Sequence, residues 1–200
     1  IKYKFLENSS VKLSYNRNKQ YLSLLSYTSI SSPEDIWKLT DPYIKPVISD
    51  QYAIGYYQNL RNNIIETSVE IYYKKLQNLI EYKNGAKLSL SEYGIKDINL
   101  TDFVLKDHVE TQLISAEGTN YGIEFMIKKN AGKLDGWISY TYSRTLKQTS
   151  VAYARDQING NRIFPSQYDK PHDLSVALNY HFTRRLRVGL NFTLISGRAV

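Results

Sequence analysis

The stretch that decides the fold is KPHDLSVALNYHFTRRLRVGLNFTLISG, residues Lys170 to Gly197. Apolar side chains occupy every second position on both sides of a short basic turn, Thr183–Arg185. They are Leu174, Val176, Leu178, Tyr180 and Phe182 before the turn, and Leu186, Val188, Leu190, Phe192 and Leu194 after it. A period of two places each set on one face of a strand. The stretch therefore predicts a β-hairpin with one apolar face, which must meet either a protein core or lipid.

Alternation of apolar and polar residues recurs along the rest of the chain. It is found in the stretches Tyr3–Tyr15, Tyr52–Tyr73 and Tyr121–Tyr142, each of which is interrupted by a short polar turn. Together with the C-terminal hairpin, these stretches predict about eight strands, several of them longer than the ~5–6 residues usual in globular sheets. Consecutive strands joined by tight turns pair antiparallel. The predicted fold class is therefore all-β, with an antiparallel sheet.

The connections between the predicted strands alternate in length. The short turns are Glu7–Ser10, Arg61–Asn63, Asn130–Leu134 and Thr183–Arg185, and the long segments are Asn18–Ser49, Lys83–Lys106 and Gln148–Asp169. In an antiparallel sheet, this alternation places every short turn at one end and every long loop at the other. Transmembrane β-barrels are built in this way, whereas a soluble sandwich has no reason to sort its loops by end. Within the first long segment, Ser32–Trp37 has the residue order of a helix start and predicts a short helical turn.

The composition and the second face of the strands also favour a membrane barrel. The chain has 18 Tyr against 6 Phe, and tyrosine suits surfaces that are apolar on one side and wet on the other. The positions between the apolar residues hold small or polar side chains such as Ser175 and Asn179, with Glu66, Glu70 and Glu124 elsewhere. We therefore expect the apolar face to contact lipid and the polar face to line a wet lumen.

Several classes of function find little support in the residues. The chain has no Cys, so it holds no disulfide and no thiolate metal site. Its three His have no metal-ligand spacing, and His172, Asp173 and Ser175 do not predict a catalytic triad, because neighbours on a strand point to opposite faces. The net charge of +7 comes from scattered Lys and Arg, so no nucleic-acid partner is expected. We predict no enzyme activity, no catalytic residues, no cofactor and no bound metal.

Several motifs resemble a known family. The run Glu117–Phe125, which contains the spacing G-x-x-YG-x-E, is similar to a strand in TonB-dependent outer-membrane receptors, and Gly136–Arg144 resembles the following strand in Bacteroidetes members. The run Phe164–Leu174 resembles their FP-x-x-YD-x-x-HDL return from a long loop, and Asp35–Lys38 and Ile44–Pro46 with Gln51–Tyr56 fit the same group. The similarity covers nearly the whole chain, and it depends on the order and spacing of the motifs taken together.

The resemblance implies a barrel of the 22-stranded type, filled by an N-terminal plug and located in the cell outer membrane. It implies active nutrient uptake with energy relayed by the TonB complex through the plug, outer-membrane lipid around the barrel, an imported small molecule or oligomer and a surface lipoprotein as a further candidate partner. Residues 1–200 show no plug, TonB box or aromatic closing strand, and they begin and end inside strand-like runs. We therefore expect them to be an interior fragment of one outer-membrane β-barrel domain.

Two alternatives remain open at this point. A secreted soluble β-sandwich binding module would share the alternation, and a passive porin would share the sorted loops but lack a plug. In every case the long segments hold the side chains that a solute would meet first, although these side chains could instead pack the loops together. The candidates for substrate contact, which offer stacking surfaces and positive charge, are Trp37, Tyr43, Tyr153, Arg155 and Arg162.

Overall fold

The computed structural model describes residues 1–25, 36–83, 112–149, 151–153 and 156–197, which form one large antiparallel sheet and a small separate hairpin. In spatial order, the main strands of the large sheet are β1 (Lys2–Leu6), β2 (Ser9–Gln20), β5 (Val47–Leu60), β6 (Ile65–Tyr82), β7 (Leu113–Lys129), β8 (Leu134–Thr149), β10 (His172–His181) and β11 (Arg187–Ile195). The short β9 (Phe164–Pro165) pairs with β8, and β3 (Leu22–Leu25) pairs with β4 (Ile36–Leu39). The all-β antiparallel fold expected from the alternation is confirmed.

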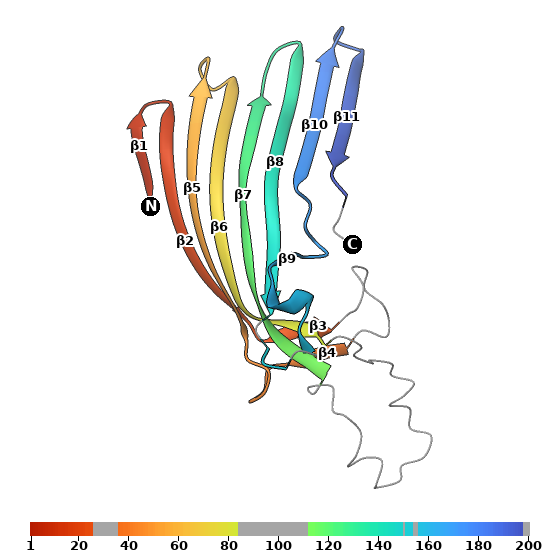
Figure 1. Ribbon diagram of the computed structural model, residues 1–200. Helices are drawn as coiled ribbons and strands as arrows, with labels where there is room; N and C mark the ends of the chain where they lie inside the picture. Colours follow the sequence, from red (N-terminus) through yellow and green to blue (C-terminus); the bar gives the residue numbers. More distant parts are fainter. Residues whose placement is uncertain (26–35, 84–111, 150, 154–155, 198–200) are drawn as a thin grey trace.

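The connections are sorted by length between the two ends of the sheet, as the sequence predicts (Figure 1). The tight turns β1–β2, β5–β6, β7–β8 and β10–β11 lie along the upper edge in Figure 1, and the strand ends from which the longer connections start lie at the lower edge. We call these edges the turn end and the loop end. Most of the long connection between β6 and β7, residues 84–111, falls outside the described part of the chain.

The central strands are long, and local sequence explains where they turn and bend. β6 has 18 residues, β7 has 17 and β8 has 16. The turn between β5 and β6 places Arg61, Asn62 and Asn63 at φ values of 50°, 55° and 68°, a region that Asn tolerates better than most residues. A bulge interrupts the β6–β7 register between Leu76 and Leu79, where Asn78 has a φ of 59°.

The helical turn expected at Ser32–Trp37 is wrong for the residues that the structure describes there. Ile36–Leu39 is strand β4, and its backbone pairs residue by residue with Leu22–Leu25. Residues 32–35 lie outside the described part of the chain. The cap-like residue order is a local signal, whereas pairing with β3 comes from a segment distant in sequence and supplies the hydrogen bonds that the helical turn would have made.

The sheet does not close over an apolar core. The buried hydrophobic residues among those described are only Leu25, Ile44, Ile114 and Ala116, and all of them lie at the loop end. Most other large apolar side chains on the strands are exposed or half-buried. In the described ranges, no helix has the length and apolar character needed to cross a membrane.

Candidate functional site

The strand register joins the apolar positions into continuous rows on one face of the sheet. One row runs across five strands through Leu13, Ile54, Ile71, Ile123 and Tyr142, each directly opposite the next. A second row crosses five strands through Val69, Phe125, Tyr140, Leu174 and Leu194. About half of the surface of Ile71 and Leu190 is exposed, 51% and 56%. This face is a broad apolar band without a protein partner among the described residues.

A row of tyrosines marks the edge of the band toward the loop end. Tyr15, Tyr52, Tyr73 and Tyr121 are consecutive cross-strand partners on β2, β5, β6 and β7, and the first two rings have centroids 5.0 Å apart. The next outward positions on β2, β5 and β6 are Arg17, Asp50 and Lys75, and they take part in the ion pairs Arg17–Asp50 and Lys75–Glu117. Tyrosines between an apolar band and a charged rim are typical of the aromatic girdle where a membrane meets water.

The opposite face of the sheet is polar, and on it the side chains of Tyr57 and Tyr72 lie over Gly55 and Gly122. The Tyr57 hydroxyl donates to Glu70 over 2.7 Å, and Glu70 stands directly opposite Glu124 on β7. A Cβ on Gly55 would come within 2.8 Å of the Tyr57 ring, so only glycine leaves room for that ring to reach Glu70. The face therefore presents hydroxyl and carboxylate groups to a wet space rather than to an apolar layer.

Side-chain hydrogen bonds fasten the connection between β8 and β10 to the sheet. Asp169 is 3% exposed, and its carboxylate accepts from Arg144 Nε over 3.0 Å and from the backbone N–H of Thr145 over 2.6 Å. Asn161, in the short turn η3 (Asn159–Asn161), exchanges hydrogen bonds with the backbone of Val151. The described part of the connection between β8 and β10 therefore has a defined conformation and offers a fixed surface for a solute.

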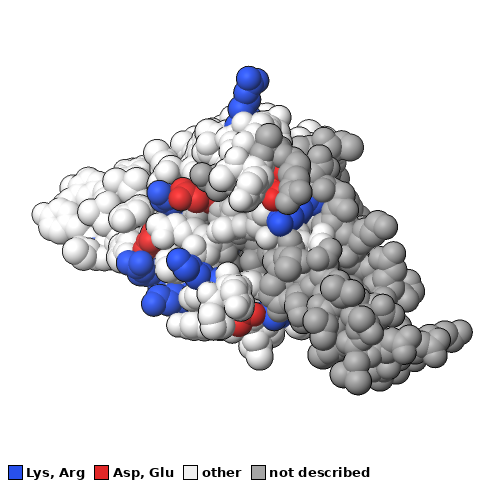
Figure 2. All heavy atoms as spheres, turned by 60° about the horizontal axis from the view of Figure 1, so that its bottom comes forward, with Lys and Arg blue, Asp and Glu red and all other residues white. Residues whose placement is uncertain are grey.

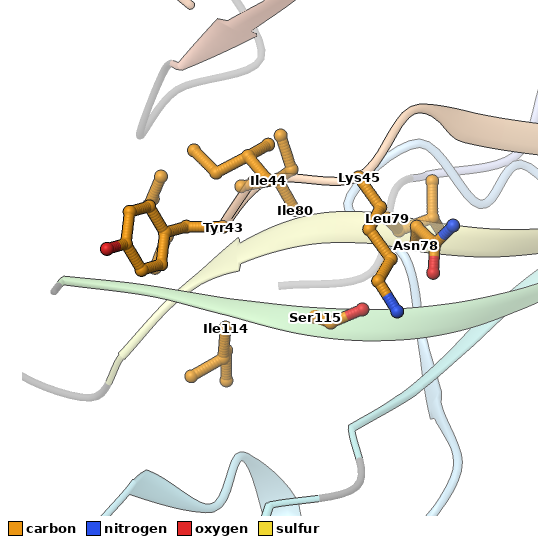
Figure 3. A pocket seen from close by; sticks show the side chains of 9 residues that line it. Tyr43, Ile44, Lys45, Asn78, Leu79, Ile80, Ile114 and Ser115 are labelled. Carbon is orange, nitrogen blue, oxygen red and sulfur yellow. The ribbon is translucent and has the colours of Figure 1, made fainter. Parts of the chain in front are cut away.

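A small pocket of about 210 Å³ opens at the loop end, between the connection that precedes β5 and strands β6 and β7 (Figure 3). Its lining is Tyr43, Ile44 and Lys45 from the connection, Asn78, Leu79 and Ile80 from β6, and Leu113, Ile114 and Ser115 from β7. Figure 3 shows the Lys45 side chain extending toward Ser115 on β7. Pockets for drug-sized ligands measure about 300–1,000 Å³, so this one suits a single ring or head group of a larger solute.

The backbone beside this pocket is shaped by Asp41. Its carboxylate accepts from the backbone N–H groups of Tyr43 and Ile44 over 2.8 and 2.7 Å, which is an Asx-type turn. The hydrogen bond from Lys38, followed by that from the Ile44 N–H, lowers the pKa of the Asp41 carboxyl below its usual value. The ionised carboxylate thereby positions Tyr43 at the mouth of the pocket.

Cations and carboxylates are interleaved at the loop end. Figure 2, which brings this end forward, shows Lys and Arg side chains beside those of Asp and Glu. The Lys and Arg ion pairs of the described residues all lie in this half of the molecule, and they are Arg17–Asp50, Lys38–Asp41, Lys75–Glu117, Lys83–Asp156, Arg144–Asp169 and Lys147–Glu81. The described part of the loop end therefore carries charges of both signs, and six of its cations are in ion pairs.

Comparison with known proteins agrees with this geometry. The sequence profile of the family described as TonB dependent receptor-like, beta-barrel matches residues 1–199. The chain belongs to that family. No curated protein sequence matches the chain. Among solved structures, the chain is similar to the alcaligin outer-membrane receptor FauA from Bordetella pertussis, with 12% identity and a TM-score of 0.48, and the match covers 96% of this chain but only 33% of that one.

Membership of the TonB-dependent receptor family fixes the general role of the sheet. Such receptors are outer-membrane transporters that interact with TonB, and they are not enzymes. In barrels of this family an apolar face with a tyrosine row is the lipid-facing wall and a polar face is the lumen wall, and we name the two faces of this sheet accordingly. The short turns lie on the periplasmic side of such barrels and the long loops on the outside.

The residues proposed from the sequence for substrate contact are spread over the loop end. Trp37 lies on β4 with 64% of its surface exposed, Tyr43 borders the pocket and is 86% exposed, and Tyr153 is 70% exposed. Arg162 is exposed just before β9, and Arg155 lies outside the described residues. Of the four that the structure describes, Tyr43 alone lines the pocket of Figure 3, and the contact roles of all five stay predictions.

His172 stands on one face of β10, and Asp173 and Ser175 stand on the other. The His172 ring lies on the lipid-facing side, with Nδ1 2.8 Å from the Tyr140 hydroxyl, while Asp173 accepts from Ser175 on the other face. Among the described residues, no group of three or more His, Asp or Glu is arranged to hold a metal ion.

Sequence reasoning missed the pocket residues Lys45 and Asn78 and the contact between Tyr57 and Glu70. Alternation assigned Glu70 correctly to the polar face, but Tyr57 is separated from it by a turn. Only the register of β5 with β6 shows that the two side chains meet. The turn Arg61–Asn63 sets that register and was the one signal that could have located the contact.

Proposed function

We propose that the chain is an interior wall segment of a TonB-dependent receptor, of the type found in Bacteroidetes, which imports a scarce nutrient across the cell outer membrane. In this proposal the segment supplies the barrel wall and outer loops and carries out no chemistry. Lipid-facing side chains cannot meet the solute, so selection belongs to the lumen face and the loop end. The proposal is carried by one observation: a chain that matches this family folds into a sheet whose exposed apolar band is bounded by a row of tyrosines.

The open edges of the sheet support a larger barrel. Within the described residues, β1 pairs only with β2, and β11 pairs only with β10. A transmembrane barrel must satisfy every strand edge, because unpaired backbone groups in lipid are costly. We therefore propose that further strands complete a barrel of the 22-stranded type and that a plug fills its lumen and couples it to the TonB complex.

The solute is proposed to be a small molecule or short oligomer that makes its first contacts at the loop end. The apolar floor of the pocket, with Tyr43 and Lys45 at its mouth, suits a ring next to an anionic or hydroxyl group. Exposed Trp37, Tyr153 and Arg162 would add stacking and charge around it, and so would Arg155. A surface lipoprotein is proposed as an additional partner that covers this end.

Uptake by cells that carry the full-length receptor tests the proposal. A labelled nutrient should enter saturably when TonB is present and should fail to enter when TonB is deleted. Replacing Tyr43 and Lys45 together, as Tyr43→Ala and Lys45→Gln, should weaken binding by about tenfold or more, since lost stacking and lost charge each cost on the order of 1 kcal/mol. The matched control Leu190→Ala, on the lipid-facing side, should bind normally.

The outcomes separate the alternatives. Uptake that is linear in concentration and indifferent to TonB would identify a passive porin. The secreted β-sandwich alternative requires a second sheet packed on the apolar face, and no such sheet lies among the described residues. Unchanged binding in the Tyr43 and Lys45 variant would move recognition to the plug or to the partner lipoprotein.

A further inference from the structure

The hairpin tips at the turn end are tied into one continuous rim. Backbone hydrogen bonds link each hairpin to the next, from the N–H groups of Asn59, Asn130 and His181 to the carbonyl oxygens of Asn8, Ile64 and Lys133, over 2.8, 2.9 and 2.8 Å. The tips consequently lie side by side along the upper edge of the sheet in Figure 1. At about 4.8 Å between strands, successive hairpins repeat about every 10 Å along this rim.

Positive charge outnumbers negative charge on the rim. The Lys and Arg within five residues of the tight turns are Lys2, Lys4, Lys12, Arg61, Lys128, Lys129, Lys133, Arg184, Arg185 and Arg187. The carboxylates in the same zone are Glu7, Glu66 and Asp135. Glu66 accepts from the Asn130 amide, and Asp135 contacts Asn179 and His181. Six Lys and Arg at the loop end form ion pairs with carboxylates, whereas none of the turn-end Lys and Arg forms a salt bridge with any residue that the structure describes.

Exposed apolar side chains stand directly beneath the charged tips on the lipid-facing side. They are Leu60, Ile64, Ile127, Leu134, Tyr180, Phe182 and Leu186, each at least 37% exposed. The Tyr180 and Phe182 rings pack edge to face with centroids 4.6 Å apart, next to Arg184 and Arg185. Aromatic rings at the end of an apolar band indicate the level of the lipid head groups. The tip cations therefore lie at that level or just beyond it.

Lys2, Lys4, Lys12, Lys128 and Arg187 alternate with lipid-facing residues and stand on the lumen face. We infer that the remaining turn-end cations, with Arg184 and Arg185 at the exposed β10–β11 tip, bind the anionic head groups of phospholipids in the leaflet that faces the turns. A soluble anionic partner would leave the apolar ring beneath the tips uncovered, whereas a phospholipid covers the ring with its acyl chains and the cations with its phosphate. Each cation near an anionic membrane surface strengthens association by about fivefold. Two neighbouring arginines should produce a local preference that is easily measured. The inference does not depend on the identity of the imported solute.

The two arginines can be replaced without disturbing their turn. The Thr183 hydroxyl accepts from the backbone N–H groups of Arg185 and Leu186 over 3.2 and 3.0 Å, and the Phe182 N–H donates to the Leu186 carbonyl over 3.1 Å. No hydrogen bond or ion pair of the turn uses the side chain of Arg184 or Arg185. Neutral substitutions there should change the charge of the tip and leave the hairpin folded.

The experiment measures which lipid lies beside the tip. The full-length protein is labelled with a fluorophore at Val188→Cys, which is lipid-facing and close to the turn, or at Leu194→Cys, about 20 Å away along β11 toward the loop end. It is placed in symmetric phosphatidylcholine vesicles, with nitroxide head-group labels on trace phosphatidylglycerol or phosphatidylcholine. At Val188→Cys, we expect quenching by labelled phosphatidylglycerol to be at least about fivefold stronger than quenching by labelled phosphatidylcholine. At Leu194→Cys, the two labelled lipids should quench equally.

Charge variants and salt then test the cause. R184Q/R185Q should remove the preference at the turn end, R184K/R185K should keep it, and the matched loop-end control R17Q/K75Q should leave it unchanged. Raising salt from 0.1 to 1 M should abolish it, because the screening length falls from about 10 to about 3 Å. Inorganic phosphate at matched ionic strength should not compete.

Three results would overturn the inference. They are equal quenching by the two lipids in the unsubstituted protein, a preference that survives R184Q/R185Q, and a loss of equal size in R17Q/K75Q. Displacement of the lipid by millimolar phosphate would also overturn it, since the rim would then be a site for free phosphate. If R184Q/R185Q fails to insert, the salt dependence together with R184K/R185K still decides the question.

Discussion

Arginine substitutions along β6 test whether the apolar face contacts lipid, because the cost must then depend on depth. The stretch from Ile65 to Tyr73 crosses the apolar band, and at ~3.3 Å per residue it spans about 26 Å along the strand. A strand tilt of about 40° reduces this to about 20 Å of depth, which is close to the ~25 Å band of outer-membrane barrels. Val69 lies midway along the stretch, between Tyr56 and Phe125 on the neighbouring strands.

The expected free energies of unfolding follow from that position. Val69→Arg should destabilise the barrel by about 2–4 kcal/mol, which is the cost of arginine at the bilayer midplane. Tyr73→Arg, at the loop-end edge of the apolar band, should cost about 0–1 kcal/mol. Ser68→Arg supplies the control one residue away on the lumen side. It should cost less than about 1 kcal/mol, because its guanidinium group stays in water near Glu70.

Reversible unfolding in guanidinium chloride, with the full-length protein in lipid vesicles and tryptophan fluorescence as the signal, measures all three variants. Solute binding by the folded fraction should be the same for Val69→Arg as for the unsubstituted protein. Equal costs for Val69→Arg and Tyr73→Arg, or a Ser68→Arg cost as large as that of Val69→Arg, would refute the assignment of the faces.

Two further predictions concern the loop end. Asp169→Asn removes the charge that holds Arg144 and should lower the free energy of opening the β8–β10 connection by about 1–2 kcal/mol. Amide hydrogen exchange in residues 156–168 should become faster as a result. The control Asp50→Asn should leave that exchange unaffected. The pKa of Asp41 is lowered in the folded protein, so the stability that its carboxylate contributes is present above the ordinary carboxyl pKa and is lost as the pH falls through the lower folded value. The solute affinity of the unsubstituted receptor should therefore decline at acid pH, and that decline should be absent in Asp41→Asn. An identical decline in both proteins would contradict this role.

The sequence by itself determined the strands, their faces and the sorting of the connections. A strand has a side-chain period of two, so the alternation within a run such as Leu186 to Leu194 is enough to show which residues form its apolar face. Short turns between such runs also force neighbouring strands to pair antiparallel. For these reasons the all-β fold and the lipid-facing side could be derived from residues that are close together in the chain.

Tertiary structure alone decided which side chains meet across strands and at the loop end. The tyrosine row needs the register of four strands, and the pocket needs Lys45 to lie over β6 and β7, which follow it much later in the chain. Ile36–Leu39 shows the same limit, since a helix-like local order was overridden by pairing with β3. Local patterns determine which face of a strand a side chain points to. Contacts between distant segments depend instead on the paths of the loops and on alternative strand pairings that differ little in free energy, so these contacts are decided only when the whole sheet assembles.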